Sequence, residues 1–209
     1  MQFNFEKALR KVYFERFMKY GAKPQGSFWA SKLRQDRRFE IILSEIKKIE
    51  KSKNFELSDI GCGYGALVNY IRSSGVSSNV RYSGYDISQG LINHCKSKYL
   101  EDWANFSVGT YPREITPYCV MSGTYNLSAT LDIIEWERYV LSSILRCWEQ
   151  TSRAMIFNLQ IAKNSQITEE MIFYAERDSI LNFCLSSLGP TKLVTHKNLP
   201  KDVTFVVIR

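Results

Sequence analysis

Histidine is scarce in this sequence, and the cysteines are isolated from one another. The 209 residues contain two histidines, His94 and His196, and five cysteines, none of which forms a Cys-x-x-Cys pair. Zinc sites and disulfide frameworks depend on closely spaced Cys and His ligands or on paired cysteines. The chain is therefore expected to be reduced and metal-free, with its cysteines acting as small apolar side chains.

Long apolar runs are also missing. No uninterrupted apolar stretch approaches the ~18 residues that a membrane-spanning helix needs. Residues 1–7 lack the basic-then-apolar order of a secretory signal peptide. With 44% apolar and 23% charged residues, the composition is that of a globular domain. We expect a cytoplasmic protein with no membrane partner.

Positive charge is unevenly distributed along the chain. Residues 1–53 hold 14 Lys and Arg residues against six Asp and Glu, whereas the remainder holds 14 against 15. Two interpretations stay open: a solvated helix surface, or an electropositive lid that attracts an anionic substrate. The aromatics interleaved with this charge are open to a similar choice between core packing and a water-excluding lid; they are Phe3, Phe5, Tyr13, Phe14, Phe17 and Tyr20.

Apolar periodicity divides the chain into two regions. Residues 1–53 carry two helical patterns, the second from about 28 to 49, separated by the Gly- and Pro-containing segment 21–26. From residue 55 strands alternate with helices, which is typical of a parallel sheet covered on both faces. Strands are expected at 55–60, 80–86, 106–108, 118–121, 154–159, 192–197 and 203–208, and helices at 66–73, 88–98, 134–151 and 176–188.

The link between the last two predicted strands is too short for a crossover helix. We therefore expect these strands to be antiparallel neighbours. The predicted fold is α/β: a Rossmann-like, seven-stranded, mostly parallel sheet with an antiparallel last strand, plus an N-terminal helical cap. Residues 1–53 form the cap as part of the same domain, and residues 54–209 form the α/β unit.

The most specific pattern is Asp59-Ile60-Gly61-Cys62-Gly63-Tyr64-Gly65, between a predicted strand and a predicted helix. Its glycines let the backbone turn tightly and approach a ligand. The helix N-terminus beyond them supplies free N–H groups and the positive end of a dipole. Asp86 ends the next strand, 21 residues after Gly65. Because a carboxylate there can accept both hydroxyls of a ribose, a nucleoside ligand is expected.

A nicotinamide cofactor is one alternative for these glycines. Residues 61–66 also satisfy the G-x-G-x-x-A fingerprint, with Asp86 near the expected acid. Asp59 argues against this alternative, because it would place a negative charge beside a pyrophosphate. The predicted closing hairpin and the absence of any Tyr-x-x-x-Lys sequence argue against it as well.

These residues resemble the class I S-adenosylmethionine-dependent methyltransferases. Residues 59–65 resemble the glycine-rich first motif of that family, and Asp86 resembles its ribose-binding acid. The resemblance implies S-adenosylmethionine as the cofactor and residues 54–209 as the methyltransferase domain, whose closing hairpin matches the family's seventh strand. It also implies that the glycine loop lines the methionine part and that Asp59 lies near its amino group. The cofactor-binding residues that we expect are Asp59, Gly61, Cys62, Gly63, Gly65, Asp86, Ile87, Thr110, Ser122, Gly123 and Arg38.

Two positions depart from the family pattern. Gly109-Thr110 stands where an acid commonly binds the adenine amine, so Thr110 or a backbone carbonyl is expected to substitute. The fourth strand begins Tyr118-Cys119 where Phe-Asp is usual. Within the family the chain resembles a group of uncharacterised bacterial small-molecule methyltransferases, through residues 35–39, 122–126 and 157–158. Arg38 is expected either at the cofactor carboxylate or in an ion pair with Glu45 or another nearby acid.

The turn after the fourth predicted strand is the expected acceptor site, and Tyr125 and Asn126 are the candidate residues. Because the resemblance implies a sulfonium methyl donor, alignment and a dry pocket matter more than a base. The expected function is O- or N-methylation, by direct SN2 transfer, of a small-molecule acceptor: a polar or anionic metabolite or saccharide. Two alternatives stay open: methylation of an RNA nucleotide, suggested by the basic N-terminus, and cofactor binding without catalysis.

Overall fold

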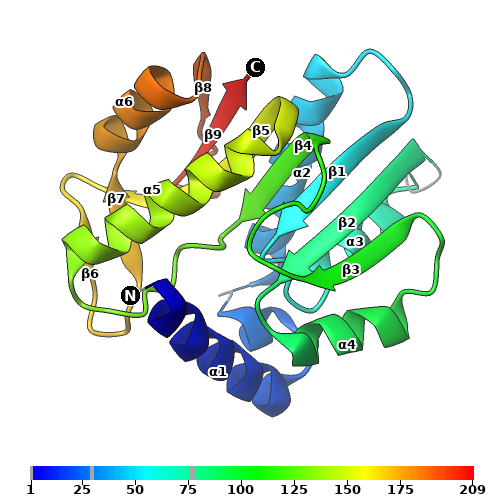
Figure 1. Ribbon diagram of the computed structural model, residues 1–209, viewed down its shortest axis with the longest axis horizontal. Coiled ribbons are helices and arrows are strands. Elements are labelled where there is room, and N and C mark those ends of the chain that lie inside the picture. The colour runs from blue at the N-terminus through cyan, green and yellow to red at the C-terminus, as the bar shows by residue number, and fades with distance from the viewer. Residues whose placement is uncertain (1, 29–30, 76–78) are drawn as a thin grey trace.

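A single mixed sheet forms the centre of the computed structural model, which describes residues 2–28, 31–75 and 79–209. Its nine strands within those residues are β1 (Phe55–Ile60), β2 (Val80–Asp86), β3 (Ala104–Val108), β4 (Thr116–Ser122), β5 (Thr151–Ala162), β6 (Gln166–Ile167), β7 (Phe173–Glu176), β8 (Thr191–Val194) and β9 (Asp202–Ile208). The strand order is β3-β2-β1-β4-β5-β7-β6, and β9 pairs with both β5 and β8. Figure 1 shows the strands with helices around them.

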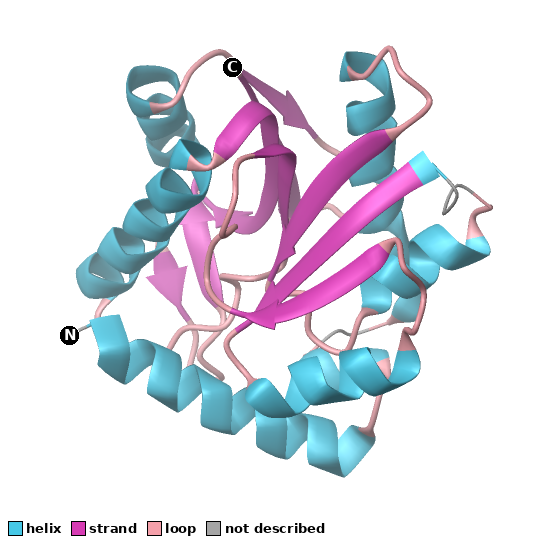
Figure 2. Ribbon diagram, turned by 45° about the vertical axis from the view of Figure 1, so that its right-hand side comes forward, coloured by secondary structure: helices cyan, strands magenta, loops and turns pink. Residues whose placement is uncertain are grey.

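Helices cover both faces of the sheet (Figure 2). They are α1 (Gln2–Tyr20), α2 (Lys32–Ile49), α3 (Ala66–Ser73), α4 (Gln89–Lys98), α5 (Ile133–Glu149) and α6 (Arg177–Ser187). One core cluster joins the sheet to α5 and α6 through residues such as Trp136 and Ile180. A second cluster joins it to α2, α3 and α4 through Ile42, Leu67 and Ile92. No helix of the described residues is both long and apolar enough to cross a bilayer.

The predicted parallel arrangement is confirmed. The seven predicted strands correspond to β1 to β5, β8 and β9. Asp59 of β1 lies beside Gly84 of β2 on one side and Val120 of β4 on the other, in parallel register. The closing strands β8 and β9 are antiparallel neighbours, as their short link predicts, and β9 is also antiparallel to β5.

The short strands β6 and β7 were not predicted from the sequence. β6 has only two residues, too few for an alternating pattern. β7 pairs with the end of β5, where Ala175 lies beside Ile161. β6 and β7 pair with each other as a local hairpin, with Gln166 beside Tyr174, and both strands are too short to show a period in the sequence.

The N-terminal region contains the two predicted helices, but the second begins later than expected. A 3-10 turn, Pro24–Ser27, follows α1, and Phe28 adopts a left-handed conformation with φ of 60°. The helix α2 begins at Lys32, where the Ser31 hydroxyl accepts a hydrogen bond from Arg34 N. Because α2 buries apolar side chains against the sheet, it is part of the core. The division between cap and domain at residue 53 stays a prediction.

The helix α1 lies across the end of the sheet at which β2 and β3 finish (Figures 1 and 2). Near one end of the helix, the Phe5 ring packs edge-on against the rings of Trp136 and Tyr139 on α5, with ring centroids 5.9 and 5.8 Å apart. Near the other end, the Phe17 ring packs edge-on against the imidazole of His94 on α4, with ring centroids 5.0 Å apart. This histidine is therefore partly covered by α1. The first helix spans from α5 to α4 over the carboxyl ends of the strands.

Candidate active site

A pocket of about 710 Å³ opens at the carboxyl ends of β1, β2 and β4. We call it the first pocket. Loops from these strands meet there because parallel strands finish at the same edge of a sheet. The helix α1 contributes Leu9 and Tyr13 to the lining of this pocket. The lining residues are Leu9, Tyr13, Ser27, Ile60, Gly61, Gly63, Asp86, Ile87, Gly109, Thr110, Ser122, Gly123, Thr124, Tyr125 and Tyr139.

The glycine loop after β1 needs its glycines for conformation and for space. Gly61 has φ of 74°, and a Cβ there would lie 2.7 Å from the Thr124 side chain. Gly65 has φ of 82°, and a Cβ there would lie 2.4 Å from the Tyr99 ring. The Gly61 and Cys62 N–H groups both donate to Tyr85 O, which ties the loop to β2. The loop conformation is therefore determined before any ligand binds.

Asp86 is buried at the end of β2 and borders the first pocket. Its carboxylate accepts hydrogen bonds from Gly63 N at 3.0 Å and from Ser88 N at 2.8 Å. Burial raises the pKa of Asp86 to about 6, and the two N–H donors lower it in part. Because each carboxylate oxygen has a further lone pair, Asp86 can still accept hydroxyl groups from a ligand.

Asp59 lies beneath the glycine loop rather than in the first pocket. It borders a smaller cavity of about 310 Å³, together with Cys62, Ser122 and Gln35. The Tyr82 hydroxyl donates to Asp59 Oδ2 at 2.6 Å. Burial raises the pKa of Asp59 to about 7, and the nearby Asp86 charge raises it further, whereas the Tyr82 hydrogen bond opposes the shift.

The turn after β4 is held by two hydrogen bonds from distant parts of the chain. Gly123 N donates to Asn158 Oδ1 at 2.7 Å, and the Thr124 hydroxyl donates to Ile60 O at 2.7 Å. The Ser122 hydroxyl, by contrast, is buried and has no hydrogen-bond partner among the described residues. It borders both the first pocket and the cavity under the glycine loop. A buried hydroxyl of this kind is a natural contact for a polar ligand group.

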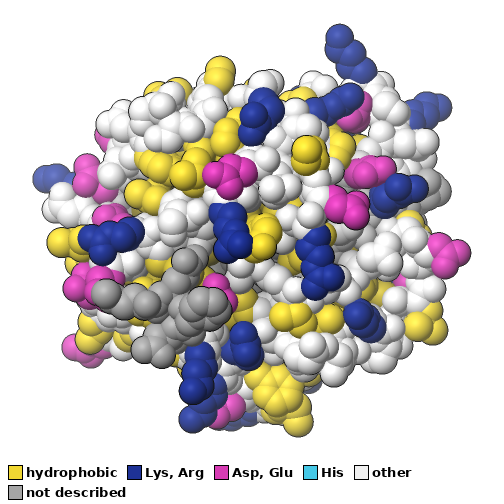
Figure 3. Space-filling model, in the orientation of Figure 1, with side chains coloured by type: hydrophobic (Ala, Val, Ile, Leu, Met, Phe, Trp, Pro, Cys, Tyr) yellow, Lys and Arg dark blue, Asp and Glu magenta, His cyan; other side chains and the backbone are white. Residues whose placement is uncertain are grey.

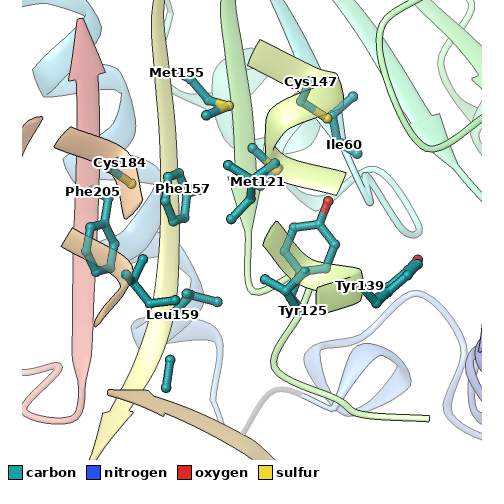
Figure 4. Close-up of a cluster of buried hydrophobic side chains, with 14 of the residues drawn as sticks. Ile60, Met121, Tyr125, Tyr139, Cys147, Met155, Phe157, Leu159, Cys184 and Phe205 are labelled. Atoms are coloured by element: carbon teal, nitrogen blue, oxygen red, sulfur yellow. The ribbon is translucent and has the colours of Figure 1, made fainter. Parts of the chain in front are cut away.

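The two acceptor candidates face different cavities. Tyr125 is 5% exposed, borders the first pocket and contacts the Tyr139 ring edge-on at 6.3 Å (Figure 4). Burial raises its pKa well above the ordinary value of a tyrosine. Asn126 borders a second pocket, and its side-chain oxygen accepts a hydrogen bond from Gln160 N at 3.3 Å.

This second pocket has a volume of about 1220 Å³. Tyr13, Ser27 and Gly123 border both pockets, so the two lie side by side. The remaining lining residues are Phe28, Arg34, Arg38, Asn126, Leu127, Gln160, Ile172, Tyr174, Leu199, Pro200, Lys201 and Asp202.

Arg38 lies in the second pocket, where it forms an ion pair with Asp202. Both side chains are largely buried. The expected alternative partner, Glu45, instead binds Lys48 and Lys192. Of the two expectations for Arg38, the structure therefore shows the ion pair. Its partner Asp202 is close in space but 164 residues away in the sequence.

Comparison with known proteins gives an independent indication of family. No family model matches the chain. Rv1506c of Mycobacterium tuberculosis, named as a candidate methyltransferase, is 25% identical over 146 residues, which are 68% of this chain and 86% of that protein. Magnesium protoporphyrin IX methyltransferase of Synechocystis PCC 6803, solved with bound SAH, superimposes with a TM-score of 0.66 and 12% identity, over 98% of this chain and 97% of that one.

A third similar protein is an S-adenosylmethionine-dependent methyltransferase of Leishmania major. Its TM-score is 0.67 at 8% identity, over 96% of this chain and 82% of that one. The chain therefore has the fold of the S-adenosylmethionine-dependent methyltransferases to which it is similar.

The structure brings most of the predicted site residues together. Gly61, Gly63, Asp86, Ile87, Thr110, Ser122 and Gly123 border the first pocket. Asp59 and Cys62 border the cavity beneath the loop. Gly65 lines neither of these, nor the second pocket, and instead begins α3 in a left-handed conformation. Their individual roles toward the cofactor stay predictions.

Several residues that border the first pocket were not assigned from the sequence. Tyr13 appeared among the N-terminal aromatics, but nothing in the sequence placed it near Asp86. Leu9, Ser27 and Tyr139 had no signal at all, because they reach the site only through packing of α1, the 3-10 turn and α5.

Proposed function

We propose that this protein is an enzyme that transfers the methyl group of S-adenosylmethionine, by direct displacement, to oxygen or nitrogen of a small polar or anionic metabolite or saccharide. The observation that carries the proposal is Asp86, buried at the edge of the first pocket and held there by the Gly63 and Ser88 N–H groups. A carboxylate in this position is suited to accept the hydroxyls of a ribose.

The other residues of the first pocket fit the rest of the cofactor. The partially buried Ile87 and Thr110 offer an apolar surface and a hydroxyl for an adenine ring. The buried Ser122 hydroxyl, without a partner among the described residues, and the Gly61–Gly63 segment suit the polar methionine part. When bound, S-adenosylmethionine supplies an activated methyl group on a sulfonium leaving group.

The protein's own contribution is alignment and exclusion of water. Leu9, Tyr13 and Tyr139 cover the first pocket with apolar and aromatic surface. A covered pocket holds the reacting groups in place and keeps competing water out. No step in such a displacement requires the protein to protonate the leaving group.

Among the described residues, neither the carboxylates that line the two pockets nor the lining tyrosines Tyr125 and Tyr139 are placed as free bases. The two carboxylates are occupied: Asp86 accepts two backbone N–H groups, and Asp202 is paired with Arg38. Burial raises the pKa of Tyr139 to about 12 and the pKa of Tyr125 well above its ordinary value, so both hydroxyls stay protonated at neutral pH. The acceptor atom is therefore expected to be nucleophilic on its own, as an unprotonated amine or an ionised oxygen is.

The RNA alternative has less support. Several N-terminal cations are engaged within the protein: Arg16 binds Gln25 O, Lys32 pairs with Asp36, and Arg37 pairs with Glu40. On the face in Figure 3, basic side chains are interspersed with acidic, apolar and uncharged ones. An extended basic surface is the usual footprint of nucleic-acid binding.

Titration calorimetry with SAH, S-adenosylmethionine and NADH tests the cofactor assignment. We expect micromolar binding of SAH and S-adenosylmethionine and no heat with NADH. Binding of NADH alone would overturn the proposal. A screen of metabolites and sugar nucleotides for incorporation of labelled methyl then separates catalysis from cofactor binding alone. Tight RNA binding that weakens steeply with salt would instead favour a nucleic-acid acceptor.

A further inference from the structure

We propose that the second pocket is the acceptor site, and that it takes a molecule with a carboxylate or phosphate group on an apolar or aromatic body. This inference rests on the proposed function, because it assigns the acceptor to the cavity beside the cofactor pocket. The evidence is the charge of the second pocket, its apolar lining and its opening toward the first pocket.

The charge of the pocket is positive. Its lining holds three cations, Arg34, Arg38 and Lys201, and one acid, Asp202. Arg38 and Asp202 neutralise each other in their buried ion pair. The positive charge of Arg34 is close enough to help lower the pKa of Arg38, although burial is the larger cause.

Arg34 and Lys201 are exposed and form no ion pair with an acid of the described residues. They belong to elements far apart in the sequence, the start of α2 and the residue before β9. An anion between them would gain charge-assisted hydrogen bonds, with a guanidinium suited to bidentate contact with carboxylate or phosphate.

The rest of the lining is suited to an apolar body. Leu127, Ile172 and Leu199 contribute aliphatic surface, and Phe28 and Tyr174 contribute aromatic rings. Two neighbours on α1 pack against the Phe28 ring. The Arg16 guanidinium lies 4.0 Å from its centroid, and the Tyr13 ring packs edge-on with its centroid 5.4 Å away. Likewise, the Lys201 ammonium lies 5.5 Å from the Tyr174 ring centroid, which places charge and aromatic surface together.

The opening between the pockets lies where an acceptor atom would meet the methyl group. Tyr13, Ser27 and Gly123 border both cavities. Tyr13 and Ser27 belong to the N-terminal region that carries the excess positive charge, so this region forms one wall of both pockets. Gly123 is held in place by its hydrogen bond to Asn158. An acceptor anchored at Arg34 and Lys201 would direct its opposite end to this opening.

Three small probes of one shape test the proposal: benzoate, phenyl phosphate and benzamide. Their affinities for the full chain, with and without SAH, are measured by ligand-observed NMR titration. We expect at least one of the two anions to bind about tenfold more tightly than the neutral amide. Whichever anion binds more tightly identifies carboxylate or phosphate as the preferred group. Equal binding of all three probes would overturn the proposal.

Charge-removing variants locate the binding. Arg34→Gln with Lys201→Gln is expected to lose about tenfold in anion affinity, with benzamide and SAH affinities unchanged. Lys96→Gln, an exposed cation on α4 outside the pocket, is the matched control and should change nothing. Each single variant is measured alongside, with its SAH affinity as the test of correct folding. An anion preference that persists in the folded double variant would contradict the assignment.

SAH binding separates the two proposals. If SAH binds to the wild type and no anion preference appears, the acceptor site is wrong and the cofactor assignment stands. If SAH does not bind at all, the proposed function itself fails.

Discussion

The hydroxyl of Tyr82 donates a 2.6 Å hydrogen bond to the carboxylate of Asp59, beneath the glycine loop. Both side chains are buried, and the pKa of Asp59 is raised to about 7, chiefly by burial. An acid whose pKa is higher in the folded state than in the unfolded state stabilises the fold most when it is protonated. This contribution is fully present below pH 3.8, the ordinary pKa of the group, and is lost as pH rises through about 7.

The free energy of unfolding should therefore increase as the pH falls from about 7 toward 4. Asp86, with a pKa of about 6, contributes in the same direction. Asp59→Asn is uncharged at every pH and should make this increase shallower. Chemical unfolding of wild type and variant at several pH values checks the difference. The same slope in both proteins would mean that Asp59 is ionised in the folded state at neutral pH.

Tyr82→Phe should destabilise the protein at neutral pH. The variant keeps the ring in its fully buried position but leaves Asp59 without this donor. Loss of one partner of a buried hydrogen bond costs about 1–3 kcal/mol. Tyr20→Phe, which affects a partly exposed tyrosine in α1, is the control and should have little effect on the unfolding midpoint.

Asp86→Ala should weaken SAH binding about ten- to a hundredfold, because hydrogen bonds to a charged group are worth about 1.5–3 kcal/mol. Calorimetry on the folded variant measures the loss, and Asp102→Ala, an exposed acid, serves as control. Unchanged affinity in Asp86→Ala would place the ribose elsewhere.

The same carboxylate predicts a pH dependence of binding. Asp86 accepts ligand hydroxyls best when ionised, and its pKa is about 6 in the free protein. SAH affinity should therefore fall as the pH drops below about 6 and level off above it. An affinity that rises between pH 7 and pH 5 would contradict the role of Asp86.

Gly65→Ala should be more destabilising than Gly75→Ala. Both glycines have positive φ, 82° and 73°, so each alanine incurs the left-handed cost of about 1–2 kcal/mol. Among the described residues, a Cβ at Gly75 meets nothing within 4 Å, whereas one at Gly65 would lie 2.4 Å from the Tyr99 ring. Overpacking at Gly65 should therefore destabilise Gly65→Ala by about 1–3 kcal/mol more than Gly75→Ala. The difference between the unfolding free energies of the two variants measures this cost. Equal losses would show that the loop relaxes around the methyl group.

The local parts of the site were predictable from the sequence. The strand, glycine loop and helix around Gly61–Gly65 are contiguous, and Asp86 ends the next strand, so spacing alone places them at one sheet edge. The antiparallel hairpin followed from the shortness of its link. These features depend on neighbouring residues, whose conformational preferences are present in any short window of sequence.

Only the tertiary structure determined what surrounds that loop. Arg38 pairs with an acid 164 residues away, Asn158 fixes the turn at Gly123, and Tyr13 reaches the first pocket from α1. The second pocket likewise arises where segments far apart in the chain pack together. Such contacts have no period along the chain, because each side chain is selected for a partner that only the folded backbone brings near.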